Sequence, residues 1–113
     1  MIHVLYIDCC IRGELSRTKK LAEAFLAELS RSGDYVVERM TLMDEPLIPF
    51  QNGFFRQREE LLEAGELDHP RFRYAHKFKA AERIVIAAPF WDLSFPALLK
   101  VYIENLCVQG ITF

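Results

Sequence analysis

Residues 2–40 read IHVLYIDCCIRGELSRTKKLAEAFLAELSRSGDYVVERM. The run 2–8 is apolar and rich in β-branched and aromatic residues, which is typical of a strand buried on both faces of a parallel sheet. From residue 21 to residue 29, apolar side chains recur at helical spacing and predict one apolar face of a helix. Residues 35–40 read as a second strand. A strand, a helix and a strand in this order predict a right-handed crossover, so we expect a parallel α/β sheet.

The rest of the chain adds a further strand and more helices. Prolines and a glycine make residues 44–55 an irregular connection. Helices are predicted at residues 56–65 and 70–81, and a proline opens the second. RIVIAAP at residues 83–89 reads as a third buried strand, and the final helix carries Pro96 in its first turn. We therefore expect a doubly wound sheet with strand order 2-1-3 and helices on both faces.

Size and composition predict one globular domain that spans residues 1–113. Of the 113 residues, 51% are apolar and 27% are charged, and the formal charge is -2. Lys and Arg are scattered, which argues against a nucleic-acid partner. No apolar run approaches the ~20 residues of a membrane helix, and the first residues lack the basic start of a signal peptide. An odd count of 3 cysteines predicts a reducing, cytoplasmic location.

Several ligand-binding signatures are absent from the sequence. The glycines form neither G-x-G-x-x-G nor a G-K-[ST] phosphate loop, which argues against a Rossmann NAD site and a P-loop NTPase. His3, His69 and His76 lack the spacing of metal ligands, and there is no C-x-x-C pair. We therefore expect no metal site.

The loops after the first and third strands are predicted to form a binding site. In open parallel sheets, ligands collect where neighbouring strands send their chains in opposite directions. Ser16 and Thr18 in the first loop offer hydroxyl groups, and Arg17 offers a positive charge beside a helix N-terminus, which favours an anion such as a phosphate. Plain helix capping is the alternative reading of these residues.

The second loop carries an apolar surface in Phe90, Trp91 and Leu93. A phosphate at one end of a site and a flat apolar surface at the other describe a phosphorylated aromatic cofactor, and FMN fits that description. Burial in the core or a dimer contact is the alternative reading of these side chains.

The segments HVLYID, LSRTKKLAEAFL, RIVIAAPFWDLSFPALLKVYIENL and GITF resemble the flavodoxin-like NAD(P)H-dependent oxidoreductases, a group that includes FMN-dependent NADH-azoreductases and quinone reductases. The most specific feature is a strand that ends in proline, followed by an aromatic flavin loop and a helix with Leu-Lys near its start. The resemblance implies FMN as the cofactor, with FAD less favoured, NAD(P)H as co-substrate and a small-molecule electron acceptor. It implies the cofactor-binding residues Cys10, Ser16, Arg17, Thr18, Pro89, Phe90, Trp91, Asp92 and Leu93.

Two positions depart from the azoreductase pattern. Cys10 stands where a serine often serves, and a thiol is the weaker hydrogen-bond donor. Trp91-Asp92 replaces a common Tyr-Asn pair and brings a carboxylate toward the flavin. An ionised carboxylate there disfavours the anionic reduced ring.

The resemblance also implies a sheet of five strands, of which this chain holds the first three. Residues 1–113 are therefore expected to be the N-terminal portion of the flavodoxin-like domain. The third strand is then left as a long apolar edge. We expect a homodimer or an association through that edge.

The leading hypothesis is an FMN-dependent NAD(P)H oxidoreductase, or a fragment of one, that passes a hydride through flavin N5 to a quinone-type or azo-type acceptor. The flavin carries the chemistry, so no catalytic side chain is expected. Two alternatives stay open: a flavodoxin-like electron carrier and a non-catalytic, truncated remnant. Flavodoxin-like electron carriers are usually strongly acidic, so the nearly neutral charge of this chain favours the oxidoreductase over the carrier.

Overall fold

Three parallel strands form a single sheet in the order β2-β1-β3. They are β1 (Ile2–Asp8), β2 (Tyr35–Thr41) and β3 (Arg83–Ala87), and the computed structural model that contains them describes residues 1–113. The central strand β1 pairs with β2 along its whole length and with β3 from Val4 to Asp8. The predicted parallel sheet with strand order 2-1-3 is therefore confirmed.

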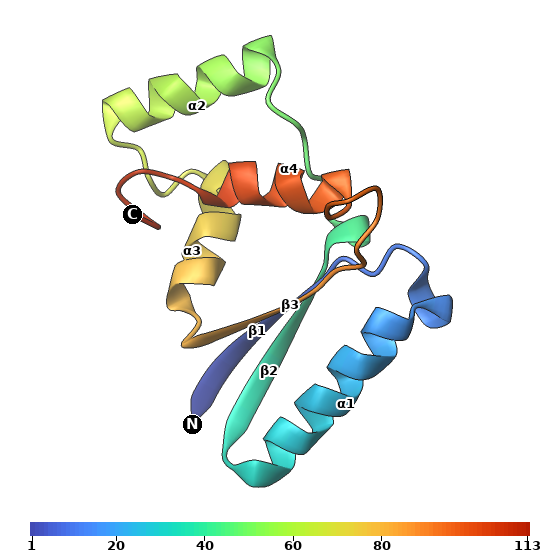
Figure 1. Ribbon diagram of the computed structural model, residues 1–113. Helices are drawn as coiled ribbons and strands as arrows, with labels where there is room; N and C mark the ends of the chain where they lie inside the picture. The colour runs from blue at the N-terminus through green and yellow to red at the C-terminus, as the bar shows by residue number, and fades with distance from the viewer.

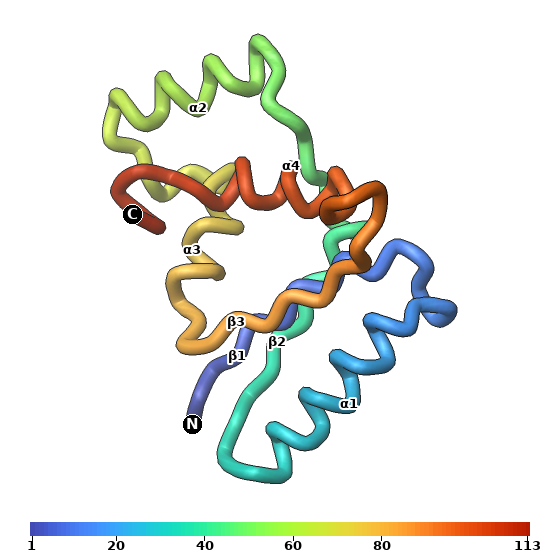
Figure 2. Tube along the Cα trace, viewed as in Figure 1, coloured from blue at the N-terminus to red at the C-terminus, as the bar shows by residue number.

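Helices cover both faces of this sheet, as predicted (Figure 1). They are α1 (Arg17–Ser32), α2 (Asn52–Ala64), α3 (Arg73–Ala80) and α4 (Ala97–Leu106). The chain trace places α1 on one face and α3 and α4 on the other, while α2 lies farther from the sheet than α4 (Figure 2). Short 3-10 helices lie between these elements at η1 (Gly13–Leu15), η2 (Leu42–Asp44) and η3 (Pro70–Phe72).

The predicted boundaries of two helices differ from those in the structure. α2 begins at Asn52, ahead of the predicted 56–65. The guanidinium carbon of Arg71 lies 3.8 Å from the centre of the Phe54 ring, and Arg71 also donates to the Phe54 carbonyl at 2.5 Å. This long-range contact stabilises an early helical turn that local sequence does not specify. The predicted helix 70–81 begins instead as the 3-10 turn η3 and becomes α-helical only in α3.

Side chains of β1 alternate between two apolar cores. Val4 and Tyr6 pack on the α1 side, and Leu5 and Ile7 pack on the side of α3 and α4. The first core also contains Cys10, Leu26 and Ala87. The second also contains Cys9, Met40, Leu42, Tyr74, Leu99, Tyr102 and Leu106. Burial of both faces explains why the sequence of β1 is a continuous apolar run and does not alternate with polar residues.

Cys9 and Cys10 belong to the two opposite cores, and both are free thiols. Burial raises the pKa of the Cys9 thiol to about 11. Burial also raises the pKa of Cys10. Both side chains are therefore neutral near pH 7, and neither supplies a thiolate.

The outer edge of β3 has no neighbouring strand. A groove of about 360 Å³ lies between this edge and α1. This β3–α1 groove is lined by Thr18, Leu21, Ala22, Phe25, Val85, Ile86 and Ala87. Leu21, Phe25 and Ile86 are 73%, 52% and 47% exposed, so the predicted apolar edge is present.

None of the helices combines the length and the apolar character that crossing a membrane requires.

Candidate functional site

The candidate site begins where β1 and β3 end side by side. Asp8 pairs with Ala87, and the backbone N–H of Cys9 donates to the Ala87 carbonyl at 2.8 Å. Beyond this point the chain from β1 turns to α1 on one face, and the chain from β3 turns to α4 on the other (Figure 1). The two loops diverge at one edge of the sheet, which is where open parallel sheets bind ligands.

A cavity of about 220 Å³ lies between these two loops. We refer to it as the β1–β3 cavity, and it is lined by Arg12, Ser16, Arg17, Thr18, Pro89, Phe90 and Trp91. All of these except Arg12 are among the predicted site residues, so the structure brings the two halves of the predicted site together. Arg12 was not among the predicted residues, because it lies in the loop before the helix start; its positive charge is the signal that could have indicated it.

Three other predicted residues, Cys10, Asp92 and Leu93, do not line this cavity. The Cys10 thiol donates to the Ala87 carbonyl at 3.6 Å, and its backbone N–H donates to Asp8 Oδ1 at 2.9 Å. Cys10 therefore ties the first loop to the end of β3. Asp92 and Leu93 form the tip of the second loop, and their part in binding a ligand stays a prediction.

The start of α1 combines a cap with a concentration of positive charge. Ser16 is the N-cap residue, and its Oγ accepts a hydrogen bond from the backbone N–H of Lys19 at 3.1 Å. The first turn contains Arg17, Lys19 and Lys20 but no carboxylate. Cations at the positive end of a helix dipole are unfavourable, and an anion bound there offsets them. Capping and anion binding are compatible, because a hydroxyl group that accepts one hydrogen bond can also donate one.

The aromatic loop is held in a tight turn. Trp91 and Ser94 exchange two backbone hydrogen bonds of 2.7 and 2.9 Å. These bonds enclose Asp92 and Leu93, whose φ angles are 51° and 66°. Two successive positive φ angles characterise a type I′ turn, which usually employs Asn, Asp or Gly. For Leu93 this conformation costs about 1–2 kcal/mol, so the surrounding structure must impose it.

This turn holds apolar side chains in solvent. Phe90, Leu93 and Phe95 are 69%, 89% and 60% exposed. Their exposure contradicts the alternative reading of this loop as part of the core. A group of exposed apolar residues on a strained loop indicates a surface that contacts a ligand or another chain.

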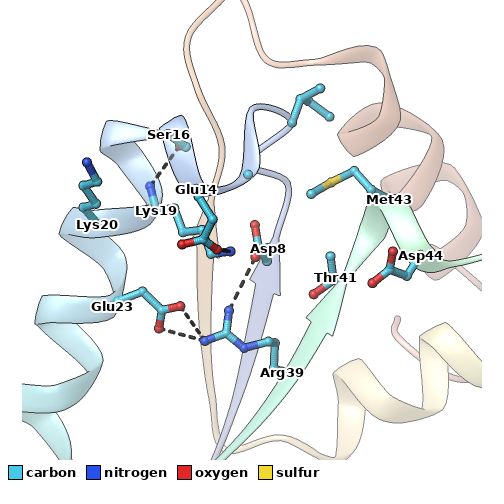
Figure 3. A pocket seen from close by; sticks show the side chains of 12 residues that line it. Asp8, Glu14, Ser16, Lys19, Lys20, Glu23, Arg39, Thr41, Met43 and Asp44 are labelled. Carbon is cyan, nitrogen blue, oxygen red and sulfur yellow. Dashed lines mark hydrogen bonds and ion pairs between the residues drawn. The ribbon is translucent and has the colours of Figure 1, made fainter.

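A second cavity, of about 730 Å³, lies on the other side of the first loop between the ends of β1 and β2 (Figure 3). The guanidinium of Arg39 lies 3.4 Å from the buried Asp8 carboxylate and 2.6 and 2.7 Å from the two oxygens of Glu23. Lys19 pairs with Glu14 at 3.1 Å. Because these charges largely neutralise one another, this charged cavity suits an anion less well than the β1–β3 cavity. This cavity was not predicted from the sequence, and Asp8 at the end of an apolar strand is the signal that could have indicated it.

Comparison with other proteins gives clear matches over the whole chain. Residues 2–113 match the profile of a family described as having a flavodoxin-like fold. The chain is 38% identical over 122 residues to FMN-dependent NADH:quinone oxidoreductase 2 of Clostridium acetobutylicum. It is 34% identical over 122 residues to the FMN-dependent NADH:quinone oxidoreductase of Coprothermobacter proteolyticus. Each match covers 100% of this chain and 57% of the relative, so the chain spans little more than half the length of these proteins.

A solved structure shares the same arrangement of strands and helices. The azoreductase from Bacillus anthracis superposes on the chain with a TM-score of 0.87 at 26% sequence identity. The superposition covers 100% of this chain and 59% of that protein.

We expect Leu93→Gly to raise the free energy of unfolding by about 0.5–1 kcal/mol. Relief of the positive-φ conformation outweighs the greater freedom that glycine gives the unfolded chain. Urea unfolding followed by circular dichroism measures the change. Leu93→Ala is the matched control, because it removes the exposed side chain and keeps a Cβ at positive φ. An equal gain in both variants would assign the effect to the exposed leucine and contradict backbone strain.

Proposed function

The chain belongs to the flavodoxin-like fold family, and on that basis we propose that it is an FMN-dependent NAD(P)H oxidoreductase, or a portion of one, acting on a small quinone-type or azo-type acceptor. The observation that carries the proposal is the β1–β3 cavity, where a basic helix start meets an exposed aromatic loop. Relatives that match the whole chain are FMN-dependent NADH:quinone oxidoreductases.

The two halves of the β1–β3 cavity suit the two ends of FMN. The phosphate would lie at the start of α1, where the hydroxyls of Ser16 and Thr18 would donate hydrogen bonds to it and Arg17 would supply positive charge. The flat ring would lie against Phe90 and Trp91 on the opposite wall. An aromatic wall and a cationic wall facing each other fit a phosphorylated aromatic cofactor better than they fit a neutral or cationic one.

The other predicted residues would support these contacts. Pro89 follows the end of β3 and directs the chain into the aromatic loop. The backbone of Asp92 and Leu93 would hold the edge of the ring, and Cys10 would keep the first loop attached to β3. An ionised Asp92 beside the ring would oppose added negative charge on it.

When bound, FMN supplies the redox chemistry by accepting a hydride from NAD(P)H and passing it to the acceptor. The chain's own residues bind the cofactor and orient it. Cys9 and Cys10 are buried neutral thiols, so neither is available as a nucleophile.

We also propose that the chain associates with a second copy of itself through the outer edge of β3. Unpaired backbone groups along an apolar strand are a template for pairing with another chain. Thr18 lines both the β3–α1 groove and the β1–β3 cavity. A chain bound along the groove would therefore also cover one side of the cofactor site. A cytoplasmic location is proposed because Cys9, Cys10 and Cys107 are all free thiols.

The direct test is to add FMN to the purified chain and record its visible spectrum and tryptophan fluorescence. Trp91 is the single tryptophan, so a ligand at the aromatic loop should quench its fluorescence. We expect a yellow complex that bleaches with NADH in the absence of oxygen. Trp91→Phe should keep the yellow colour and lose the fluorescence signal. Colour without bleaching would favour the electron carrier, and failure to take up FMN would favour the remnant.

Replacing Ser16 and Thr18 together by Ala should weaken FMN binding by about 1–3 kcal/mol, the scale of lost hydrogen bonds to a charged group. Since Ser16 also caps α1, Thr18→Val is the cleaner single variant, because it removes a hydroxyl and leaves the cap. The control is Ser32→Ala at the far end of α1, where the hydroxyl donates to the Leu29 carbonyl. An unchanged dissociation constant in the double variant would contradict the phosphate assignment.

We expect the purified chain to associate, and we expect Ile86→Lys to reduce the assembly to single chains, because a charge on an edge strand opposes strand pairing. Light scattering measures the mass of the assembly. Val36→Lys on β2, the opposite edge of the sheet, is the matched control and should leave the assembly unchanged. A wild-type chain that is already a monomer would contradict association through β3.

A further inference from the structure

Arg12 is a charged residue of the β1–β3 cavity that the family resemblance does not assign. It lies between the end of β1 and the 3-10 helix η1, and it lines the cavity together with Arg17. The seven lining residues include no carboxylate. Neither arginine belongs to any ion pair of the structure. Two exposed arginines without an ion-pair partner therefore line one small cavity.

In the neighbouring charged cavity, by contrast, two cations are paired with carboxylates. There, Arg39 is held by Glu23 and by the buried Asp8 (Figure 3). Lys19, in the first turn of α1, is likewise held by Glu14. Lys19 and Arg39 on this side of the first loop are thus paired with carboxylates, whereas Arg12 and Arg17 on the other side are not.

The backbone of the first loop brings the two arginines to the same place. Gly13 has a φ of 61° and turns the chain back immediately after Arg12. The Ser16 N–H donates to the Gly13 carbonyl at 2.9 Å and closes the turn just before Arg17. This turn places Arg12 and Arg17, which precede and follow Ser16 in the sequence, at the same end of α1.

We propose that Arg12 and Arg17 form a clamp for the doubly charged phosphate of a monoester. A guanidinium group binds phosphate oxygens through paired hydrogen bonds, and two such groups match a dianion better than a single negative charge. The clamp makes the site selective for FMN over ligands that carry the same ring without a terminal monoester, such as riboflavin or FAD. This inference rests on the proposed function and names the residue that determines its cofactor specificity.

The clamp is tested by titrating wild-type and variant chains with FMN and with riboflavin while following Trp91 fluorescence. Arg12→Gln should weaken FMN binding, because it removes one positive charge from the phosphate site. The loss should be modest, about 3- to 10-fold, because Arg12 is exposed and water screens its charge. Riboflavin binding should stay within about twofold, since that ligand has no phosphate for the clamp to hold. Arg12 makes no side-chain cap to η1, so the substitution leaves the loop's hydrogen bonds in place.

Lys20→Gln is the matched control, because Lys20 is a nearby cation in the first turn of α1 that lines the charged cavity and not the β1–β3 cavity. It should leave the ratio of the two affinities unchanged. An unchanged ratio in Arg12→Gln, or an equal loss in Lys20→Gln, would overturn the clamp and leave the proposed function standing. A wild-type chain that binds neither flavin would overturn both.

Discussion

The structure depends on one constraint, the burial of β1 on both faces and along both edges. Val4 and Tyr6 pack under α1, Leu5 and Ile7 pack under α3 and α4, and β2 and β3 pair with the two edges. A strand enclosed in this way cannot shift its register without moving apolar side chains to the wrong face. Because parallel neighbours end at one edge of the sheet, this constraint also fixes where the two functional loops diverge.

Electrostatics then distinguishes the two sides of the first loop. On the side of β2, the charges of Asp8, Glu23 and Arg39 are largely satisfied by one another. On the side of β3, the positive end of the α1 dipole and two arginines have no opposing carboxylate in the cavity wall. The helix is retained because Ser16 caps it and Leu26 packs into the core, so it tolerates a first turn that is electrostatically unfavourable without an anion.

The third feature is apolar surface that the chain by itself leaves uncovered. The aromatic loop is kept in a strained turn by the hydrogen bonds between Trp91 and Ser94, and its neighbours Phe90 and Phe95 stay in solvent. The β3–α1 groove continues this surface along the edge of the sheet. Exposed apolar area next to a ligand cavity costs solvation free energy, and both a bound aromatic ring and a second chain would recover it.

The sequence by itself determined the parallel sheet, its strand order and most of the candidate site. The apolar run of β1 and the helical spacing that follows it carry that information locally, and Ser16, Thr18 and Trp91 could be named from the loops alone. Only the tertiary structure decided the early start of α2, since that turn depends on a contact with the distant Arg71. It likewise decided that Cys10 lies outside the cavity wall and that Arg12 lies within it. The physical reason is that a local pattern specifies which face a residue occupies, whereas the partners of a side chain depend on backbone turns and on segments far apart in the sequence.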